Sequence, residues 1–496
     1  MLRDLLMRLT GSRRPAGDAV PRLKRIVAEQ GLGPAIAFGR AEAARDPDPA
    51  LQRALGGLLI EAARQVFGRI PDATDEEQAH ALYREAVERL RASLHGRPDP
   101  TGHRSCGIAL RELGDLEAAH AAFLAAHRLR PTDPQFEADL AFSYQCLGET
   151  ARALQTYETA IAAHAEDANA RAAYALSLLG AGEFAHGWDE YDWRLRVPGA
   201  VASVPAPFPV WQGEALAGKT ILVRSEQGIG DEIMFASCVP DLLAAGAQCV
   251  IECSRRLTGL FARSFPSVRV IARDRLRPPD PAALGAIDLQ CHAGSLPRWL
   301  RRSADDFPGT PYLRADAARI AAWRERLGDE AGVLRVGIAW TGGLPGTLRA
   351  ARSISLAALE PLLRMRNARF VALELGECSA AVDAMSRATG ARIDVWQGVA
   401  ALPDEAAALC CALDVVVCVP TAMAHLAGAL GRPVWVLVPG VGTWRYLWQG
   451  DRMPWYGSMR VLRRASGSDV QSVVEGARDA LESFTRSAAP RIPGRA

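Results

Sequence analysis

Two stretches of the chain hold residues whose types and spacing could bind and transform an anionic substrate. In the first, Gly228, Gly230 and Asp231 follow an apolar run. Glycines let a backbone approach a substrate closely, and a carboxylate at the start of a helix is held ionised by the helix dipole. Asp231 is therefore a candidate general base, and a helix N-cap is the alternative reading. A dinucleotide motif would need a third glycine where the chain has Ile233, which counts against that cofactor.

The second stretch has the pattern strand, turn, helix, turn, strand. Residues 415–419 and 434–438 are apolar runs, and between them a small-residue helix is expected from about 422 to 430, with Thr421 as its N-cap. The first amides of this helix would point out of the carboxyl end of a buried strand, where they and the helix dipole favour a phosphate. Many such units bind nothing, so a purely structural turn is the alternative.

Composition narrows the classes of function. The 496 residues include 58 Lys and Arg against 56 Asp and Glu, a net charge of +2 that gives no support to nucleic-acid binding. The ten cysteines form no CxxC pair, which favours reduced, buried thiols of a cytoplasmic protein over disulfides or a zinc site. Because no apolar run is long enough to span a membrane, we expect no transmembrane segment. Residues 1–10 predict a frayed or packed terminal helix rather than a signal peptide, and a weak amphipathic membrane foot is the alternative.

A period of 34 residues runs through the middle of the first 200 residues. Five columns keep it: Gly107, Ala141 and Ala175; Leu110, Tyr144 and Leu178; Gly114, Gly148 and Gly182; Ala119, Ala153 and Gly187; Phe123, Tyr157 and Tyr191. Small residues at a helix crossing, a turn glycine and an aromatic in the second helix resemble the tetratricopeptide repeat. We expect two full repeats, a third that runs into residues 188–193, and a degenerate one before residue 98. Such stacks leave a groove for a peptide or protein partner, and a structural or dimerisation surface is the alternative.

The rest of the chain alternates strands and helices. Residues 219–224, 249–252 and 268–271 are expected strands of a first Rossmann-like half, in which a loop at 225–231 leads into a helix at 232–244. A helix near 317–323 precedes a second half. Its expected strands are 333–340, 370–373, 415–419 and 434–438, followed by an amphipathic helix at 470–484. Two such sheets bind ligands at the carboxyl ends of their strands, around a shared cleft.

The domain boundaries follow from these patterns. The proline-rich residues 205–209 separate the helical part from the α/β part. The predicted domains are a helical region at 1–97, tetratricopeptide repeats at 98–200, a first Rossmann-like domain at 210–315 and a second at 330–485.

A family resemblance appears from about residue 100 to the C-terminus. It is carried by Trp-Gln-Gly at 211–213, residues 216–231, Arg-Val-Gly-Ile-Ala-Trp-Thr-Gly at 335–342, Arg-Ser-Ile-Ser-Leu at 352–356, residues 424–435 and Pro-Trp-Tyr-Gly-Ser-Met-Arg at 454–460. In this order they resemble bacterial tetratricopeptide-repeat proteins with a heptosyltransferase-like glycosyltransferase domain of family 9. The resemblance implies an all-α repeat solenoid followed by an α/β GT-B domain made of two Rossmann-like halves.

The resemblance also implies a reaction. Members bind a nucleotide-activated sugar in the cleft and transfer it with inversion, without a metal or a further cofactor. In some relatives the repeats recruit a flagellin as the protein acceptor. The implied function is a cytoplasmic glycosyltransferase that uses a nucleotide-sugar and a protein acceptor held by the repeats.

Site residues follow by matching the motifs. Asp231 matches the proposed base that deprotonates the acceptor hydroxyl. Thr421, Ala422 and His425 match the diphosphate-binding turn and helix, and Arg352 lies near a basic position that neutralises the leaving phosphate. Glu377 or Glu374 would accept hydrogen bonds from a ribose. The residues expected to contact the donor are Gly228, Gly230, Trp340, Arg352, Glu377, Thr421, Ala422 and His425.

Two other functions stay open. One is transfer to a lipopolysaccharide core or another glycan, with the repeats only docking the enzyme. The other is a non-catalytic adaptor. It is favoured by Pro420, because the family usually has an Asp there and proline supplies neither a carboxylate nor an N–H. The retained Asp231, Arg352 and His425 argue against it.

Overall fold

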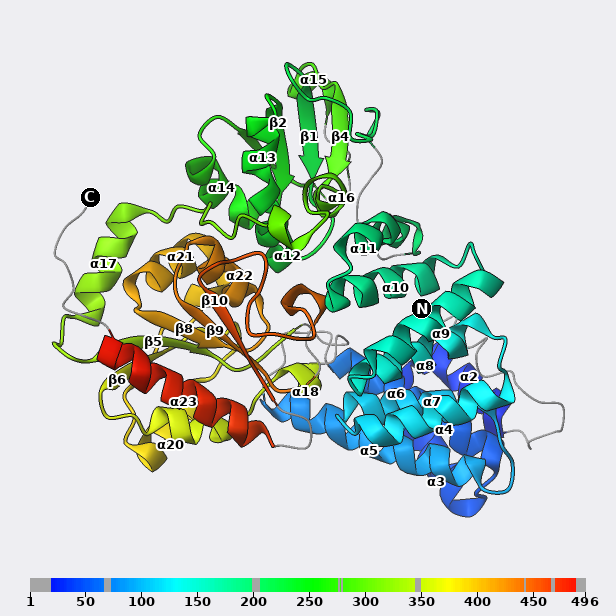
Figure 1. Cartoon of the computed structure of the whole chain (residues 1–496). Helices are drawn as coiled ribbons and strands as arrows, with labels where there is room; N and C mark the ends of the chain where they lie inside the picture. The colour runs from blue at the N-terminus through cyan, green and yellow to red at the C-terminus, as the bar shows by residue number, and fades with distance from the viewer. Residues whose placement is uncertain are drawn as a thin grey trace. The chain divides into compact units, whose positions relative to one another are not determined.

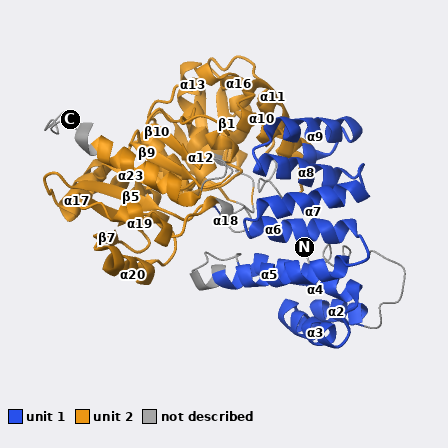
Figure 2. Ribbon diagram, turned by 60° about the horizontal axis from the view of Figure 1, so that its bottom comes forward, with its two compact units in different colours: residues 1–170, 343–351 blue, residues 171–342, 352–496 orange. Residues whose placement is uncertain are grey.

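A computed structural model describes residues 19–66, 73–198, 206–274, 277, 280–343, 349–440, 443–464 and 469–487. The helix expected in residues 1–10 lies outside these ranges. Two compact units divide the chain, residues 1–170 with 343–351 and residues 171–342 with 352–496 (Figure 2). The first unit contains the helices up to the end of the second clear repeat, and the second unit holds nearly all of the third repeat and both α/β halves. The exact domain boundaries stay predictions.

The first unit consists of helices. They are α2 (Ala19–Gln30), α3 (Leu32–Arg45), α4 (Pro49–Val66), α5 (Ala73–Leu94), α6 (Pro100–Glu112), α7 (Leu116–Leu129), α8 (Pro134–Cys146) and α9 (Thr150–Ala163). Figure 2 shows α6, α7, α8 and α9 lying side by side in one stack. Buried aliphatic and aromatic side chains of α2 to α7 form one continuous core.

The 34-residue period is confirmed as a repeat of helix pairs. Helices α6 and α8 start 34 residues apart, each after an aspartate N-cap and with proline in the first turn. Between the helices of each pair, Gly114 and Gly148 have φ of 82° and 77°, a conformation that favours glycine. A Cβ at Gly107 would lie 2.8 Å from the ring of Phe123, so the helices cross where the side chain is smallest.

The third repeat is built into the core of the second unit. Helix α10 (Ala168–Ala181) and helix α11 (Phe184–Tyr191) lead into a 3₁₀ helix, η1 (Asp192–Arg196). Trp188, 1% exposed, contacts the ring edges of Tyr191 at 5.2 Å and Trp444 at 5.6 Å between centroids. Its ring also lies 6.4 Å from Phe235 and 6.2 Å from Trp455. The last helix pair therefore shares a core with the α/β halves.

The first α/β half contains a four-stranded parallel sheet in the order β3-β2-β1-β4. The strands are β1 (Thr220–Arg224), β2 (Gln248–Cys253), β3 (Arg269–Ala272) and β4 (Leu289–His292). Its helices are α12 (Ile229–Phe235), η2 (Ala236–Cys238), α13 (Val239–Ala244), η3 (Arg255–Leu257), α14 (Thr258–Ser264), α15 (Pro281–Leu284), η4 (Ala293–Ser295), α16 (Pro297–Leu300) and η5 (Ala304–Asp306). The prediction of a single helix at 232–244 is wrong. Helix α12 starts three residues earlier, and a 3₁₀ turn before Pro240 separates α12 from α13.

The second half contains a six-stranded parallel sheet in the order β10-β9-β8-β5-β6-β7. The strands are β5 (Leu334–Ala339), β6 (Ala368–Ala372), β7 (Ile393–Val395), β8 (Val415–Cys418), β9 (Val434–Val438) and β10 (Met459–Arg463). Its helices are α17 (Ala317–Leu327), η6 (Ala357–Leu359), α19 (Glu360–Leu363), α20 (Ser379–Thr389), η7 (Val399–Ala401), α21 (Pro403–Ala412), α22 (Ala422–Ala429), η8 (Trp444–Tyr446) and α23 (Val470–Ser487). The short helix α18 (Arg349–Arg352) lies between β5 and η6 in the sequence, and all of it but Arg352 is assigned to the first unit. Figure 1 shows the two sheets as separate layers, each with helices beside it.

The predicted fold class is confirmed: an all-α repeat array precedes two Rossmann-like halves, as the GT-B resemblance implies. All seven expected strands are present. The sequence reading missed β4, β7 and β10, which are short or carry polar residues. The ten cysteines are free thiols, eight of them buried. Among the described residues, no helix combines the length and apolar character needed to cross a membrane.

Candidate functional site

The two stretches singled out in the sequence meet inside the second unit. Strand β1 leads to α12, and strand β8 leads through Pro420 to α22, so both helices start at carboxyl ends of strands. A Cβ added at Gly230 would lie 3.3 Å from Cδ2 of His425 and 3.4 Å from Cα of Ala422. The glycine turn of the first half therefore lies directly against the start of α22, and a larger residue at 230 would push on it.

An ion pair joins the two halves at this point. Asp231 lies in the first turn of α12, whose N-cap is Gly228, so the reading of Asp231 as an N-cap is wrong. Nε of Arg445 donates a hydrogen bond of 2.7 Å to Oδ1 of Asp231, and Nη2 contacts the same oxygen. Arg445 follows β9, and its guanidinium lies 4.7 Å from the ring centroid of Trp444.

Arg445 stays protonated and positively charged in this site. Burial disfavours the cation, but the neighbouring Asp231 and Tyr191 outweigh it, and the pKa of the guanidinium lies above its ordinary value. The site therefore presents a carboxylate and a permanent cation, supplied by different halves of the α/β part.

His425 is a neutral hydrogen-bonding group in this site. Only 4% of it is exposed. Its Nδ1 lies 3.2 Å from the Tyr456 hydroxyl and its Nε2 lies 3.5 Å from the Tyr446 hydroxyl. Burial, and then the charge of Arg445, lower the pKa of His425 to about 3. A neutral imidazole between two tyrosines can orient neighbouring groups, but it adds no positive charge for a phosphate.

Thr421 and Ala422 occupy the expected place at the start of α22. Thr421 is the N-cap, with extended backbone at φ −147°, but its hydroxyl makes no capping hydrogen bond to any described residue. The residue therefore stands at the predicted position without using its side chain for the predicted cap. Ala422, the first residue of α22, lies against the Gly230 turn described above.

Arg352 comes close to the same strand ends through its backbone. A Cβ at Gly342 would lie 2.5 Å from the carbonyl oxygen of Arg352 and 3.1 Å from that of Pro420. Because only glycine fits between these carbonyls, the segment after β5 lies against the turn after β8. Arg352 thus belongs to the edge of the sheet where the site lies.

Three of the expected donor contacts make structural interactions. The Trp340 side chain is buried in the core of the second half. Oε1 of Glu374 accepts hydrogen bonds from the backbone N–H groups of Trp340 and Thr341, at 2.6 and 2.9 Å. Glu377 is exposed at the start of α20, and hydrogen bonds from Ser379, one of them from its backbone N–H at 2.8 Å, lower the Glu377 pKa. Roles of these residues in binding a donor stay predictions.

A buried polar cluster under the Gly228 turn was missed by the sequence reading. Nη2 of Arg194 donates to Oε1 of Glu226 at 2.8 Å and to Oγ of Ser295 at 3.0 Å, and the Glu226 side chain is 1% exposed. Arg194 follows the third repeat, so the repeat region supplies the cation for a carboxylate at the end of β1. The sequence pattern does not predict this pair, because 32 positions separate Arg194 and Glu226.

We expect the stability of the protein to fall in acid because of His425. The unfolded chain protonates this imidazole near pH 6.5, whereas the native protein does so only near pH 3, so between these values the unfolded state binds the extra proton. The free energy of unfolding then decreases as the pH falls through this window, and above pH 6.5 His425 has no such effect. Urea unfolding of the wild type and a His425→Gln variant should show their difference in stability shifting by about 2 kcal/mol from pH 7 to pH 5. A constant difference would contradict a buried, neutral His425.

Comparisons with known proteins found one curated relative and several similar solved structures. A comparison with models of protein families found no match. Protein FlbA of Caulobacter vibrioides is 31% identical over 399 residues, which are 76% of this chain and 66% of FlbA, so the chain spans just under two thirds of that relative. Similar solved structures include the ADP-heptose lipopolysaccharide heptosyltransferase II of E. coli, at 16% identity over 54% of this chain and 98% of that chain, with a TM-score of 0.40. They also include the tetratricopeptide-repeat protein TTC0263 of Thermus thermophilus, at 22% identity over 36% of this chain and 89% of that chain, with a TM-score of 0.28. The similar solved structures thus include tetratricopeptide-repeat proteins and a heptosyltransferase.

Proposed function

We propose that this protein is a glycosyltransferase that moves a sugar from a nucleotide-activated donor to an acceptor hydroxyl at the Asp231–Arg445 site. The observation that carries the proposal is the placement of this carboxylate and this cation. They come from different halves, beside the start of α22 and at the carboxyl ends of two parallel sheets. A base and an anion-binding edge are the two parts that such a transfer needs.

In the proposed step, a carboxylate oxygen of Asp231 takes the proton of the acceptor hydroxyl while the oxygen of the acceptor attacks the anomeric carbon of the donor. The bond from this carbon to the nucleotide diphosphate breaks, and the diphosphate leaves with the electron pair. A single displacement of this kind inverts the anomeric configuration. The first amides of α22, Arg445 and Arg352 would neutralise the leaving group, so the proposal assigns this charge to protein groups rather than to a metal ion or a further cofactor.

Binding of the donor would also weaken the ion pair between Arg445 and the proposed base, Asp231. Arg445 bonds the Asp231 carboxylate in the structure, and a diphosphate at the start of α22 would compete for the same guanidinium. Pro420 carries no charge, whereas an aspartate at this position would repel the diphosphate. Donor binding would thus loosen Arg445 from Asp231 as it fills the pocket.

The repeats support a protein acceptor. Helices α6 to α9 form pairs of the tetratricopeptide-repeat kind, and stacks of such pairs bind peptides and proteins. We propose that they present a flagellin-like protein to the site, in the cytoplasm. Transfer to a glycan is the second form of the same activity, and it would leave the repeats a docking role.

Nucleotide binding tests the proposal. We expect one of UDP, ADP, GDP, CMP and TDP to stabilise the protein, by about 2.7 kcal/mol at 100 times its dissociation constant. The measurement is thermal unfolding with each nucleotide, and Asp383→Asn, at an exposed position of α20, is the matched control for site variants. If every nucleotide leaves the unfolding temperature unchanged, the donor pocket is absent and the adaptor function, favoured by Pro420, replaces the proposal.

Arg445 should matter for this binding beyond its contact with Asp231. An Arg445→Met variant is expected to weaken binding of the stabilising nucleotide by about tenfold or more, because a hydrogen bond to a charged group contributes about 1.5–3 kcal/mol. Arg445→Lys should restore part of the affinity, since it keeps the charge without the planar fork. The control is Arg364→Met, because Arg364 pairs with Glu360 on an exposed surface. Titration calorimetry that finds the same affinity in Arg445→Met and wild type would remove Arg445 from the donor pocket.

A further inference from the structure

The turn that leads to Asp231 is held by residues 168–196, which form α10, α11 and η1 and are called the third-repeat segment below. The Arg194 side chain in this segment is 9% exposed, and its Nη2 donates to Oε1 of Glu226 at 2.8 Å. Glu226 lies two residues before Gly228, the N-cap of α12. A Cβ added at Gly294 would lie 2.6 Å from Oε1 of Glu226 and 2.9 Å from Nη2 of Arg194, so this pair is enclosed on another side by the segment after β4. Because the turn from Glu226 to Asp231 is short, a shift of Glu226 would move the proposed base.

A second side chain of the third-repeat segment bonds the same turn. Tyr191 is 3% exposed, and Nε2 of Gln227 donates to its hydroxyl at 3.0 Å. Nε2 of Gln227 also donates to Oε1 of Glu226 at 3.1 Å, so these contacts form one network. Burial raises the pKa of the Tyr191 hydroxyl to about 12, and the charges of Arg445 and Asp231 also act on it, because both groups lie near the hydroxyl. The segment therefore reaches the turn before the base with two side chains.

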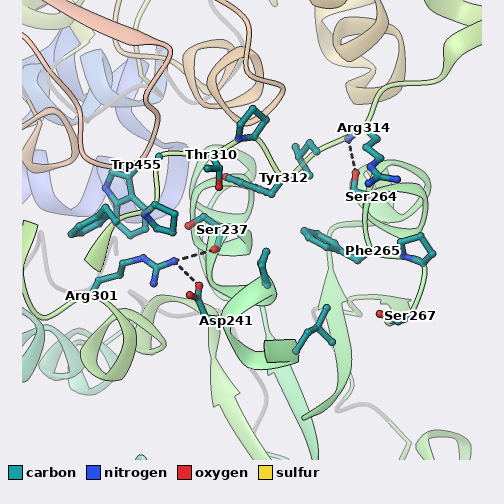
Figure 3. Close-up of a pocket in the computed structure, with 18 residues that line it drawn as sticks. Ser237, Asp241, Ser264, Phe265, Ser267, Arg301, Thr310, Tyr312, Arg314 and Trp455 are labelled. Carbon is teal, nitrogen blue, oxygen red and sulfur yellow. Dashed lines mark hydrogen bonds and ion pairs between the residues drawn. The ribbon is translucent and has the colours of Figure 1, made fainter. Parts of the chain in front are cut away.

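The rest of α12 is fixed by other contacts inside the α/β part. The Tyr312 hydroxyl donates to the carbonyl oxygen of Ile233 at 2.7 Å. Nη2 of Arg301 donates to the carbonyl oxygen of Ser237, in η2 directly after α12, at 3.1 Å and to Oδ2 of Asp241 at 2.7 Å. Figure 3, a close-up of a cavity beside α13, shows Arg301 with these two partners. Loss of the contacts from the third-repeat segment is therefore expected to move the start of α12 and not its end.

The third-repeat segment also holds the loop that follows Arg445. The backbone N–H of Trp448 donates to the carbonyl oxygen of Gly180, in α10, at 2.9 Å. A Cβ added at Gly180 would lie 2.6 Å from Nε1 of Trp448, so the indole lies directly on α10. Leu447, between Arg445 and Trp448, has φ of 58° and ψ of 178°. Residues other than glycine persist in this conformation only where their surroundings hold it, and the contact of Trp448 with Gly180 is part of that hold.

We propose that the third-repeat segment positions both members of the Asp231–Arg445 pair. Arg194 and Tyr191 are the positioning residues for the base, and Gly180 is the positioning residue for the cation. The two members come from different halves, and this segment contacts the chain close to each of them. Reacting groups that shift by about 1 Å lose about 10²-fold in rate, so a common support for base and cation affects turnover directly. The effect on turnover rests on the proposed transfer reaction, whereas the positioning itself does not.

Two variants of the full chain test the base side. Arg194→Lys keeps the positive charge and removes the planar fork, and Tyr191→Phe keeps the ring and removes only the hydroxyl that bonds the turn. We expect kcat for release of nucleotide from the nucleotide-sugar to fall about tenfold in Arg194→Lys and about threefold in Tyr191→Phe. The dissociation constant of the stabilising nucleotide should stay within about twofold of the wild-type value, because Arg445 and the start of α22 bind its charge. Arg364→Lys, in an exposed pair with Glu360, is the matched control.

Gly180→Ala tests the cation side. The added methyl group meets the Trp448 indole and should displace the loop that carries Arg445. Nucleotide affinity is then expected to fall about fivefold or more, because a displaced guanidinium no longer reaches the diphosphate. Gly476→Ala is the matched control, since a Cβ at this position of α23 has no neighbour within 4 Å. A role in packing alone predicts that kcat and affinity fall together with thermal stability, whereas positioning predicts a loss of kcat on one side and of affinity on the other.

Hydrogen exchange measures the placement without the reaction. Arg194→Lys should speed exchange of the amides at 226–232, Gly180→Ala should speed exchange at 445–450, and neither should change exchange at 236–244. If the wild type releases no nucleotide but these two changes appear, the transfer reaction is wrong and the positioning holds. If Arg194→Lys does not fold, Tyr191→Phe decides the base side.

Three results would overturn the positioning. The first is wild-type exchange at both 226–232 and 445–450 in these variants. The second, in an active enzyme, is wild-type kcat in the base-side variants or wild-type nucleotide affinity in Gly180→Ala. The third is a fall of kcat and affinity in proportion to thermal stability in every variant.

Discussion

Asp231→Asn is expected to lower the rate of sugar transfer by about 10²–10⁴-fold, the usual contribution of a general base. Asparagine keeps the size of the side chain and an oxygen that accepts from Arg445, so the contact between the two halves is retained. What it removes is the ability to take a proton from the acceptor. Nucleotide affinity should be unchanged or tighter, because Arg445 is then held less strongly by residue 231.

The measurement is the release of free nucleotide from the nucleotide-sugar whose nucleotide stabilises the wild type, with water or an added hydroxyl compound as acceptor. Asp383→Asn should release nucleotide at the wild-type rate, since that aspartate is exposed on α20. Wild-type turnover in Asp231→Asn would show that another group is the base. Equal loss of binding and turnover would show that Asp231 acts through the shape of the site.

Trp188→Ala should produce a large loss of stability of the second unit. The indole is 1% exposed, and its ring contacts Tyr191, Phe235, Trp444 and Trp455, which come from both α/β halves and from the third repeat. Removing a buried tryptophan costs about 3–5 kcal/mol, because the lost apolar contact adds to an unfilled cavity. Trp444 adjoins Arg445, so transfer activity should fall as well.

Two variants separate the packing of Trp188 from other effects. The Nε1 of Trp188 has no hydrogen-bond partner among the described residues, so Trp188→Phe loses only ring volume and should destabilise clearly less than alanine. Trp299→Ala removes a tryptophan that is 37% exposed and should have a smaller effect. Urea unfolding followed by circular dichroism gives the free energies. If Trp188→Ala costs under about 1 kcal/mol, the third repeat is not an integral part of this core.

The spacing of small, aromatic and apolar residues in the sequence predicts most of the fold. The 34-residue columns predicted the helix pairs, because each small or aromatic residue must recur where the same helices cross. Seven strands were visible because strands of parallel sheets are buried on both faces and read as apolar runs. Strand β4, with the sequence Leu-Gln-Cys-His, has no such run, and its parallel pairing with β1 makes it a strand.

Some residues of the candidate site can likewise be predicted from the sequence, and others cannot. Asp231, Thr421 and Ala422 were found because they follow strands, and chain direction alone brings strand ends to one edge of a sheet. Arg445 also follows a strand, β9, yet its partner lies 214 residues away, and no local pattern encodes that distance. The sequence by itself determined the helix pairs, the two parallel sheets and the residues at their strand ends. Only the tertiary structure decided that Arg445 pairs with Asp231, that burial keeps His425 neutral, and that Trp188 joins the last repeat to the α/β core, because each depends on groups brought together from distant segments.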